Sequence, residues 1–390
     1  MPPLRGTLGQ KPESDSPMNF TRRRFFYVAG TFAAAAGAGW LLPLLTKRRP
    51  LRTPDPLIDC HVHLFGAGDT PGLAENERCF LSPAQRKHWT YSYLLRLLKI
   101  RRDGPMDNPY VERLLAQLRT SSLARVLLLA QDARYDTEGR LDLQRTTSIY
   151  VPNRYLFRVV KQNPDSFLPC PSINPKRRDA LDELGYCYEQ GARVLKIHPP
   201  TQDVDPGEPR FRPFFRRCAE LGVTVIVHTG TEHSAEIVGD EYSDPSRLTL
   251  ALDEGCRVVA CHAGTRAFFD KADFYPYLVS MMHRYPNLYC DTAVLGSMFR
   301  WRCLPQMLES ELVMSRTLHG SDFPFPSNAF VFWHRLGFSE LFRLLAEKNL
   351  LERDFRLKRA LGLPLSTFSL GTKLFSPVKP QGTRMNLEQR

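Results

Sequence analysis

The sequence contains no Cys-x-x-Cys pair, and its nine cysteines form an odd set. Disulfide frameworks and cysteine zinc sites need paired cysteines, so we expect neither. No glycine-rich phosphate loop of the GxGxxG or P-loop type follows any apolar run, which argues against an open nucleotide-binding sheet. Asp and Glu (41 residues) are also fewer than Lys and Arg (53 residues), and the formal net charge is +12 at pH 7.

The excess positive charge lies largely at the N-terminus. Residues 1–50 carry eight Lys or Arg against one Glu and one Asp, which accounts for half of the net charge. What remains is only mildly basic, and we therefore do not expect a nucleic-acid partner.

The first 55 residues resemble an export signal followed by a linker. The segment Thr21-Arg22-Arg23-Arg24-Phe25-Phe26 matches the twin-arginine pattern and opens an uncharged apolar stretch over residues 25–45. Because about 20 apolar residues can cross a bilayer, the same stretch could remain as a membrane anchor. The sequence predicts an exported protein, periplasmic or held at the outer face of the cytoplasmic membrane, and leaves cleavage open.

Short apolar runs alternate with helical patterns between residues 56 and 375. The expected strands are residues 57–63, 124–130, 167–173, 193–198, 223–228, 257–262, 287–291 and 316–320. From the third run onward, the strand ends recur at intervals of roughly 30 residues, which suits one helix and two loops. This alternation predicts an α/β protein with a closed (β/α)8 TIM barrel. Residues 376–390 are expected to form a flexible tail.

One interval is longer than the others. Residues 64–123 separate the first two expected strands and contain helical patterns at residues 89–100 and 108–118. An insertion here lies at the catalytic end of a barrel, where it could form a lid over the pocket. An ordinary packing hairpin and a membrane-facing helix carrying Leu94, Leu95 and Leu98 are the alternatives.

The clearest chemical signal is the segment Asp59-Cys60-His61-Val62-His63, which closes the first expected strand. Side chains alternate between the two faces of a strand, so Asp59, His61 and His63 are expected on one face. Two imidazoles that converge on one point form half of a metal site. Two surface histidines are the alternative, but the apolar neighbours indicate a buried strand.

Other expected strands end in residues that bind metals or transfer protons. His198, His228 and His262 follow the fourth, fifth and sixth strands, and Asp322 follows the eighth. Barrel active sites are assembled at the C-terminal ends of the strands. We therefore expect these four side chains to meet the two histidines of the first strand.

The order of these motifs resembles the amidohydrolase superfamily, in particular the amidohydrolase-related branch that includes aminocarboxymuconate semialdehyde decarboxylase. The motifs are Asp59-Cys-His-Val-His63, Val151-Pro-Asn153, Ile173-Asn-Pro175, Lys196-Ile-His198-Pro-Pro200, Ile226-Val-His228-Thr-Gly230, Ala260-Cys-His262-Ala-Gly264 and Gly320-Ser-Asp322-Phe-Pro324. The resemblance implies a divalent metal, with Zn²⁺ as the expected ion. Its implied ligands are His61, His63, His228 and Asp322.

The resemblance also implies roles for the remaining residues. Asp322 would transfer a proton of the reacting water, and His262 would orient that water and polarise the substrate. Lys196 and His198 could bind substrate or a second metal. Some superfamily members use a carboxylated lysine on the fourth strand to bridge two metals, and the resemblance would make Lys196 such a ligand. An unmodified Lys196 could instead bind a substrate carboxylate or cap the barrel rim. Asp59 is expected to support a metal-bound histidine rather than to bind metal.

The expected function is a metal-dependent hydrolase that attacks an amide, lactone or ester carbonyl of a small molecule, which could be anionic. A non-oxidative decarboxylase of an aromatic or unsaturated carboxylate is the alternative on the same metal site. An inactive barrel that serves as a membrane-tethered binding protein is a third reading, but no expected ligand is missing. The oligomeric state is open.

Overall fold

The strands of this computed structural model, which describes residues 48–375, form two parallel sheets and one short antiparallel pair. They are β1 (Ile58–His63), β2 (Phe80–Leu81), β3 (Arg125–Leu129), β4 (Ile149–Tyr150), β5 (Phe167–Cys170), β6 (Val194–Ile197), β7 (Thr224–Val227), β8 (Val258–Ala260), β9 (Leu288–Asp291) and β10 (Thr317–Leu318). One parallel sheet has the order β1-β3-β5, the other runs from β6 to β10, and β2 pairs with β4. The expected tail and most of the expected export segment lie outside the described residues.

Backbone hydrogen bonds join the two parallel sheets at both edges. Lys196 N donates to Pro171 O at 2.8 Å beyond the end of β5, and Cys60 N donates to His319 O at 2.8 Å beyond β10. The parallel strands therefore form a closed ring, and each lies within one of the eight runs expected from the sequence. The ring matters for function because the C-terminal ends of all its strands lie at one rim.

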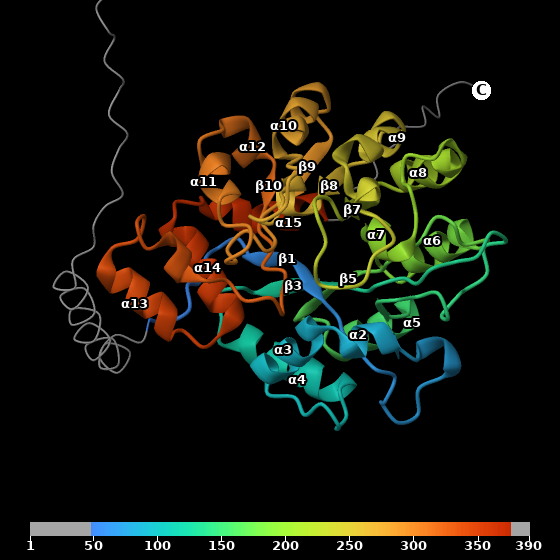
Figure 1. Cartoon of the computed structure of the whole chain (residues 1–390), viewed down its shortest axis with the longest axis horizontal. Coiled ribbons are helices and arrows are strands. Elements are labelled where there is room, and N and C mark those ends of the chain that lie inside the picture. Colours follow the sequence, from blue (N-terminus) through green and yellow to red (C-terminus); the bar gives the residue numbers. More distant parts are fainter. Residues whose placement is uncertain (1–47, 376–390) are drawn as a thin grey trace, which may run out of the picture. The chain divides into compact units, whose positions relative to one another are not determined.

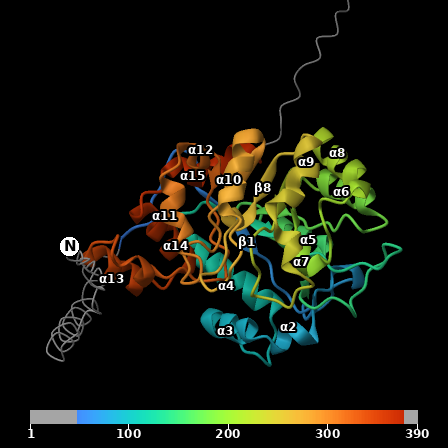
Figure 2. The same ribbon diagram turned by 45° about the horizontal axis from the view of Figure 1, so that its top comes forward.

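Most of the helices lie around the outside of this ring (Figure 1; Figure 2). They are α2 (Pro83–Lys87), α3 (Trp89–Leu98), α4 (Asp107–Arg119), α5 (Asn153–Gln162), α6 (Ala180–Glu189), α7 (Pro199–Gln202), α8 (Arg212–Glu220), α9 (Thr249–Asp253), α10 (Tyr275–Arg284), α11 (Cys303–Leu308), α12 (Glu311–Ser315), α13 (Phe338–Ala346), α14 (Leu350–Ala360) and α15 (Leu365–Leu374). Capping residues in the local sequence determine where these helices begin and end, as α14 shows. Helix α14 begins after Asn349, whose side chain accepts from Glu352 N, and ends before Gly362 at φ +108°.

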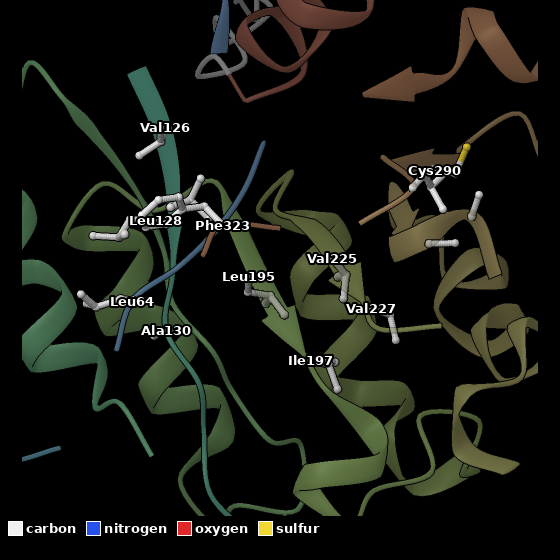
Figure 3. Packing of buried hydrophobic residues seen from close by; sticks show 14 of the residues in the cluster. Leu64, Val126, Leu128, Ala130, Leu195, Ile197, Val225, Val227, Cys290 and Phe323 are labelled. Carbon is white, nitrogen blue, oxygen red and sulfur yellow. The ribbon is translucent and has the colours of Figure 1, made fainter. Parts of the chain in front are cut away.

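Alternating side chains of the strands build two apolar layers. Leu127 and Leu129 of β3 point into the ring, where they join apolar residues from the other strands. Val126 and Leu128 point outward and pack against the helices, as Figure 3 shows for several strands. All four side chains are buried, and each contributes about 1.5–3 kcal/mol relative to an exposed position. Packing on both sides holds the strand ends in fixed positions.

Strand β1 contains one extra residue relative to β3. Asp59 pairs with Val126 and His63 pairs with Leu129, so the register shifts between them. Asp59 consequently lies on the outward side with Val126, whereas His63 lies on the inward side with Leu129. The expectation that Asp59 shares a face with both histidines is wrong because a bulge interrupts the alternation.

Helices α2, α3 and α4 lie between β1 and β3 in the chain. Leu94, Leu95 and Leu98 of α3 are buried at 8%, 4% and 4% exposure, which excludes the alternative in which they face a membrane. Of the helices within residues 48–375, none has the length and apolar character needed to cross a bilayer.

Candidate metal centre

Three groups of side chains that could hold a metal lie at the C-terminal rim of the ring. The first consists of His61, His63 and Asp322, the second of His198, His228 and Glu232, and the third of His61, Cys261 and His262. In each group the three ligand atoms lie within 4.8 Å of one another. The rim thus brings together the residues that the sequence placed at separate strand ends.

The first group unites the two histidines of β1 with Asp322. Asp322 Oδ1 lies 3.1 Å from His63 Nε2 and 3.3 Å from His61 Nε2. The loop after β10 is held against β1 because Asp322 N donates to His61 O at 3.0 Å. Asp322 has a φ of +68°, a conformation that is uncommon for residues other than glycine. Such backbone strain is typical of functional sites.

Asp291, the last residue of β9, orients His61. Its Oδ2 lies 2.8 Å from His61 Nδ1, which therefore carries the proton and leaves Nε2 free to face Asp322. Carboxylates commonly orient metal-binding histidines in this way. Asp291 was not among the predicted site residues, although it is an acidic residue at the end of the seventh expected strand.

The protonation states of the first group suit the binding of a cation. Burial lowers the pKa of His61 to about 4, so its imidazole is neutral at pH 7, as metal binding requires. Burial acts to raise the pKa of Asp322, but the hydrogen bond from His63 and the nearby imidazoles lower it below its usual range. Imidazole nitrogens beside an ionised carboxylate form a donor set that fits a divalent metal such as Zn²⁺.

His262 follows β8 and lies between the first two groups. Its ring centroid is 5.2 Å from that of His61 and 4.8 Å from that of His228. Its Nδ1 lies 3.1 Å from Ala293 O, and its Nε2 lies 3.2 Å from His228 Nδ1. His262 has a φ of +57°, and burial lowers its pKa to about 3. It is therefore a neutral imidazole held in a strained turn.

The second group combines His198, His228 and Glu232. Glu232 Oε2 lies 3.3 Å from His198 Nε2 and 3.6 Å from His228 Nε2, and the two rings stack with centroids 4.1 Å apart. His228 was expected to join the histidines of β1, yet its free nitrogen faces Glu232. Glu232 was not expected at all, although it follows His228 by four residues in the sequence.

Lys196 of β6 is fully buried inside the ring. Its Nζ lies 2.8 Å from Cys261 Sγ and 3.5 Å from His61 Nε2. Burial raises the pKa of Cys261 well above its usual range, so the thiol of the third group stays protonated and is a poor metal ligand. Lys196 and His198, expected on one face, are therefore directed to different partners.

Asp59 supports the first group through backbone hydrogen bonds. Its Oδ1 accepts hydrogen bonds from His61 N at 3.0 Å and from Ser321 N at 2.9 Å. These bonds tie β1 to the loop that carries Asp322, and burial raises the pKa of Asp59 to about 7.

A cavity of about 550 Å³ opens beside these groups, and its wall includes His228, His262 and Asp322. The rest of the wall includes Trp89, Tyr93, Leu97, Phe269, Met298, Phe299, Arg300 and Arg353. Three of these residues come from α3, which therefore borders the space where a substrate would approach the rim.

Comparisons with known proteins identify a family and a fold. The profile of a family described as Amidohydrolase matches residues 58–334. A search of curated proteins finds no match. An uncharacterised TIM-barrel protein from Bordetella bronchiseptica, Bb4693, is similar in fold, with a TM-score of 0.50 and 17% identity over 79% of this chain and 99% of that chain.

Two further solved structures have lower scores. A 5-carboxyvanillate decarboxylase from Sphingomonas paucimobilis has a TM-score of 0.45 and 14% identity, over 79% of this chain and 99% of that chain. A protein provisionally named 2-pyrone-4,6-dicarboxylic acid hydrolase from Pseudomonas putida has a TM-score of 0.45 and 19% identity over the same shares.

Proposed function

Because the chain belongs to the amidohydrolase family, we propose that it is an enzyme that uses a divalent metal to hydrolyse an amide, lactone or ester bond of a small molecule. The observation that carries the proposal is the group formed by His61, His63 and Asp322, with His61 oriented by Asp291. A site of this kind needs a fixed tautomer and an ionised carboxylate, and both are present.

We assign His61, His63 and Asp322 as the metal ligands, with Zn²⁺ as the ion. A divalent metal at this position would supply a Lewis acid for the carbonyl and lower the pKa of a water molecule to about 7. His228, the fourth ligand expected from the sequence, would need to turn away from His262 and Glu232 to join them.

Asp322 is the proposed proton-transfer group. Its carboxylate faces the two histidines with Oδ1, so Oδ2 can accept a proton from the attacking water and return it to the leaving group. His262 is proposed to assist from the neighbouring turn. Since Ala293 O accepts the Nδ1 proton, His262 Nε2 is an acceptor that lies 3.2 Å from His228 Nδ1, and it would orient a water molecule or a polar substrate group once His228 turns away.

The cavity supports a substrate with an apolar body and an anionic group. Arg300 lines its wall and is buried, with 8% of its surface exposed. Its guanidinium donates to the carbonyl oxygens of Thr231 and Thr265, and no carboxylate within residues 48–375 lies within 4.0 Å of it. A buried cation without an ion-pair partner favours an anionic ligand. Trp89 and Phe299 would cover the apolar part.

The same arginine supports a second candidate function. A non-oxidative decarboxylase of an aromatic or unsaturated carboxylate would use the metal group and bind its substrate beside Arg300. Hydrolysis and decarboxylation differ in their products, so a direct assay separates them.

We also propose that α3 belongs to a lid formed within residues 64–123, because Trp89 and Tyr93 line the cavity. For the N-terminus we propose export of the chain through the twin-arginine pattern. Replacing Arg22 and Arg23 by lysine should abolish delivery of a reporter fused after residue 55, and unchanged delivery would refute this assignment.

The test of the enzymatic proposal combines metal analysis with a substrate screen. The full chain should contain stoichiometric metal and act on at least one lactone, amide, ester or aromatic carboxylate, with acid release and CO₂ release followed separately. Asp322→Asn should lower kcat by at least about 100-fold, whereas Asp273→Asn, at an exposed position, should not. Absence of metal, or full activity of Asp322→Asn, would refute the proposal.

A further inference from the structure

Large apolar side chains surround the mouth of the cavity and are exposed to solvent. Six of the residues in the cavity wall leave between 37% and 58% of their surface exposed, namely Trp89, Tyr93, Phe269, Met298, Phe299 and Leu345. We call these six residues the apolar rim. Single exposed apolar residues are common on protein surfaces, but a group that borders one opening is typical of a contact surface.

Helix α3 supplies two aromatic residues of the apolar rim. Leu94 and Leu95 on its inner face are buried, whereas Trp89 and Tyr93, four residues apart, share its outer face. The ring centroids of these two aromatic residues lie 6.3 Å apart, so their side chains form one surface. A helix that is apolar on both faces is normally covered on both. Residues 48–375 leave the aromatic face of α3 open to solvent.

Helix α13 extends this apolar surface toward the start of the described chain. Phe338 lies two turns before Leu345 on the same side of α13 and is 76% exposed. Glu340 of this helix pairs with Arg48, with 2.9 Å between Oε2 and Nη2. Glu340 and Leu345 are five residues apart, which is about 7.5 Å along the helix axis. The chain therefore enters the barrel beside the apolar rim.

The sequence just before Arg48 can hold the protein at a bilayer. Residues 25–45 are uncharged and apolar, and their length suits a bilayer span. Leu45 precedes Arg48 by three residues, which span at most about 11 Å. A bilayer that holds residues 25–45 would therefore lie close to α13 and to the apolar rim.

Exposed basic residues accompany the aromatic face of α3. Residues 83–104, which include α2 and α3, contain six Lys or Arg and one acidic residue, Asp103, and all seven are exposed. Helical segments that lie on anionic bilayers combine aromatic side chains, which enter the lipid, with Lys and Arg, which contact the phosphates. The charge favours an anionic lipid surface over a second copy of this chain, because a symmetric dimer through α3 would bring two of these basic segments together.

We propose that the apolar rim and Phe338 dock on the surface of an anionic lipid bilayer. In this orientation Trp89, Tyr93 and Phe338 enter the boundary between the headgroups and the acyl chains, and the mouth of the cavity faces the lipid. The buried leucines of α3 take no part. Docking requires neither metal nor turnover and is therefore independent of the proposed function.

The test is photo-cross-linking of the full chain reconstituted in vesicles of phosphatidylethanolamine and phosphatidylglycerol. A phospholipid with a diazirine on its acyl chain labels residues in contact with lipid, and mass spectrometry locates the label. The peptide that carries Leu345 should be labelled at least about 10-fold more than the peptide that carries Leu181. Leu181 is the matched reference, because it is a leucine with 48% exposure on α6, which lies far from α13 in both views (Figure 1; Figure 2).

Two substitutions on α3 test the role of the aromatic side chains. Trp89→Ser combined with Tyr93→Ser should lower the labelling of the Leu345 peptide by at least about 5-fold. Tyr277→Ser is the control variant and should leave the labelling unchanged, because Tyr277 is also 48% exposed but lies outside the cavity wall. Circular dichroism checks that both variants fold.

Equal labelling of the Leu345 and Leu181 peptides in the native chain would overturn the proposal, because the chain would then be held near the lipid without a fixed orientation. Label confined to residues 25–45 would overturn it too, as would native labelling in the folded double variant. A native chain that sediments as a dimer and carries no label at Leu345 would also overturn it, because a second copy would then cover the apolar rim. None of these outcomes bears on metal binding or turnover, so the proposed function is tested separately.

Discussion

Asp291 Oδ2 lies 2.8 Å from His61 Nδ1, and both side chains are fully buried. The other oxygen of Asp291 accepts from His262 N at 2.7 Å and from Ala293 N at 3.0 Å. The carboxylate of Asp291 therefore connects β1, the turn after β8 and the residues that follow β9. It sets both the tautomer of a proposed ligand and the position of a proposed catalytic residue.

Replacement of Asp291 by asparagine should weaken zinc binding. The amide oxygen can still accept from His61 Nδ1, but the negative charge that makes the imidazole a better donor is lost. We expect a decrease in zinc affinity of about 10–100-fold, measured by competition with a chelator. Asp273→Asn, an exposed substitution, should leave the affinity unchanged. Equal affinity in Asp291→Asn and the native chain would contradict the role given to this carboxylate.

Lys358 supports the loop that carries Asp322. It is fully buried, and its Nζ donates to Gly320 O and to Asp354 Oδ2, each at 2.6 Å. Lys358→Met would leave a buried carboxylate unpaired, and we expect a loss of about 3–5 kcal/mol in the free energy of unfolding. Denaturant titration measures this loss.

The control for Lys358 is Lys373→Met, which changes an exposed lysine of α15 and should alter stability little. A loss below about 1 kcal/mol in Lys358→Met would mean that the pair is not needed to hold this loop.

Asp354 should make stability depend on pH. Burial, only partly offset by Lys358, raises its pKa from 3.8 to about 6. A raised pKa in the folded state contributes stability that is present below pH 4 and is lost as the pH rises through 6. Relative to Asp354→Asn, which cannot titrate, the native chain should lose stability between pH 4 and pH 7, by at most about 1.4 kcal/mol per pH unit.

Denaturant titrations of both proteins across this pH range test the Asp354 prediction. A stability difference that is constant with pH, or one that favours the native chain increasingly as the pH rises, would show that folding does not raise the pKa of Asp354.

Arg300 should determine affinity for an anionic substrate. Once a substrate is known, Arg300→Gln should raise its KM by at least about 10-fold, because the lost contact is a charge-assisted one. A neutral analogue should show a much smaller change, which separates charge recognition from disturbance of the loops that hold Thr231 and Thr265. Arg302→Gln, two residues along the chain and exposed, is the matched control. Equal effects on charged and neutral substrates would contradict the prediction.

The eight barrel strands and the first half of the metal site were predictable from the sequence. Strand runs and their spacing depend on residues that are close in the chain, and buried parallel strands such as Arg125–Leu129 have a strong apolar pattern. The His61 and His63 pair was equally visible, because its spacing reflects the local geometry of a strand.

Three features of the site required the tertiary structure. The bulge that turns Asp59 away from His63 depends on register with β3. The contact between His61 and Asp291 joins residues 230 positions apart. The pairing of His228 with Glu232 rather than with Asp322 depends on how a loop after β7 folds back onto the rim.

These outcomes have one physical cause. Neighbours in the chain decide whether a segment forms a strand and which residues end it, so the sequence determined the barrel and the residues at its rim. The direction of each imidazole depends on acceptors that distant strands supply, such as Asp291 for His61 and Ala293 for His262. The hydrogen-bond partner of each imidazole nitrogen therefore depends on the tertiary structure, which brings these strands together in the closed ring.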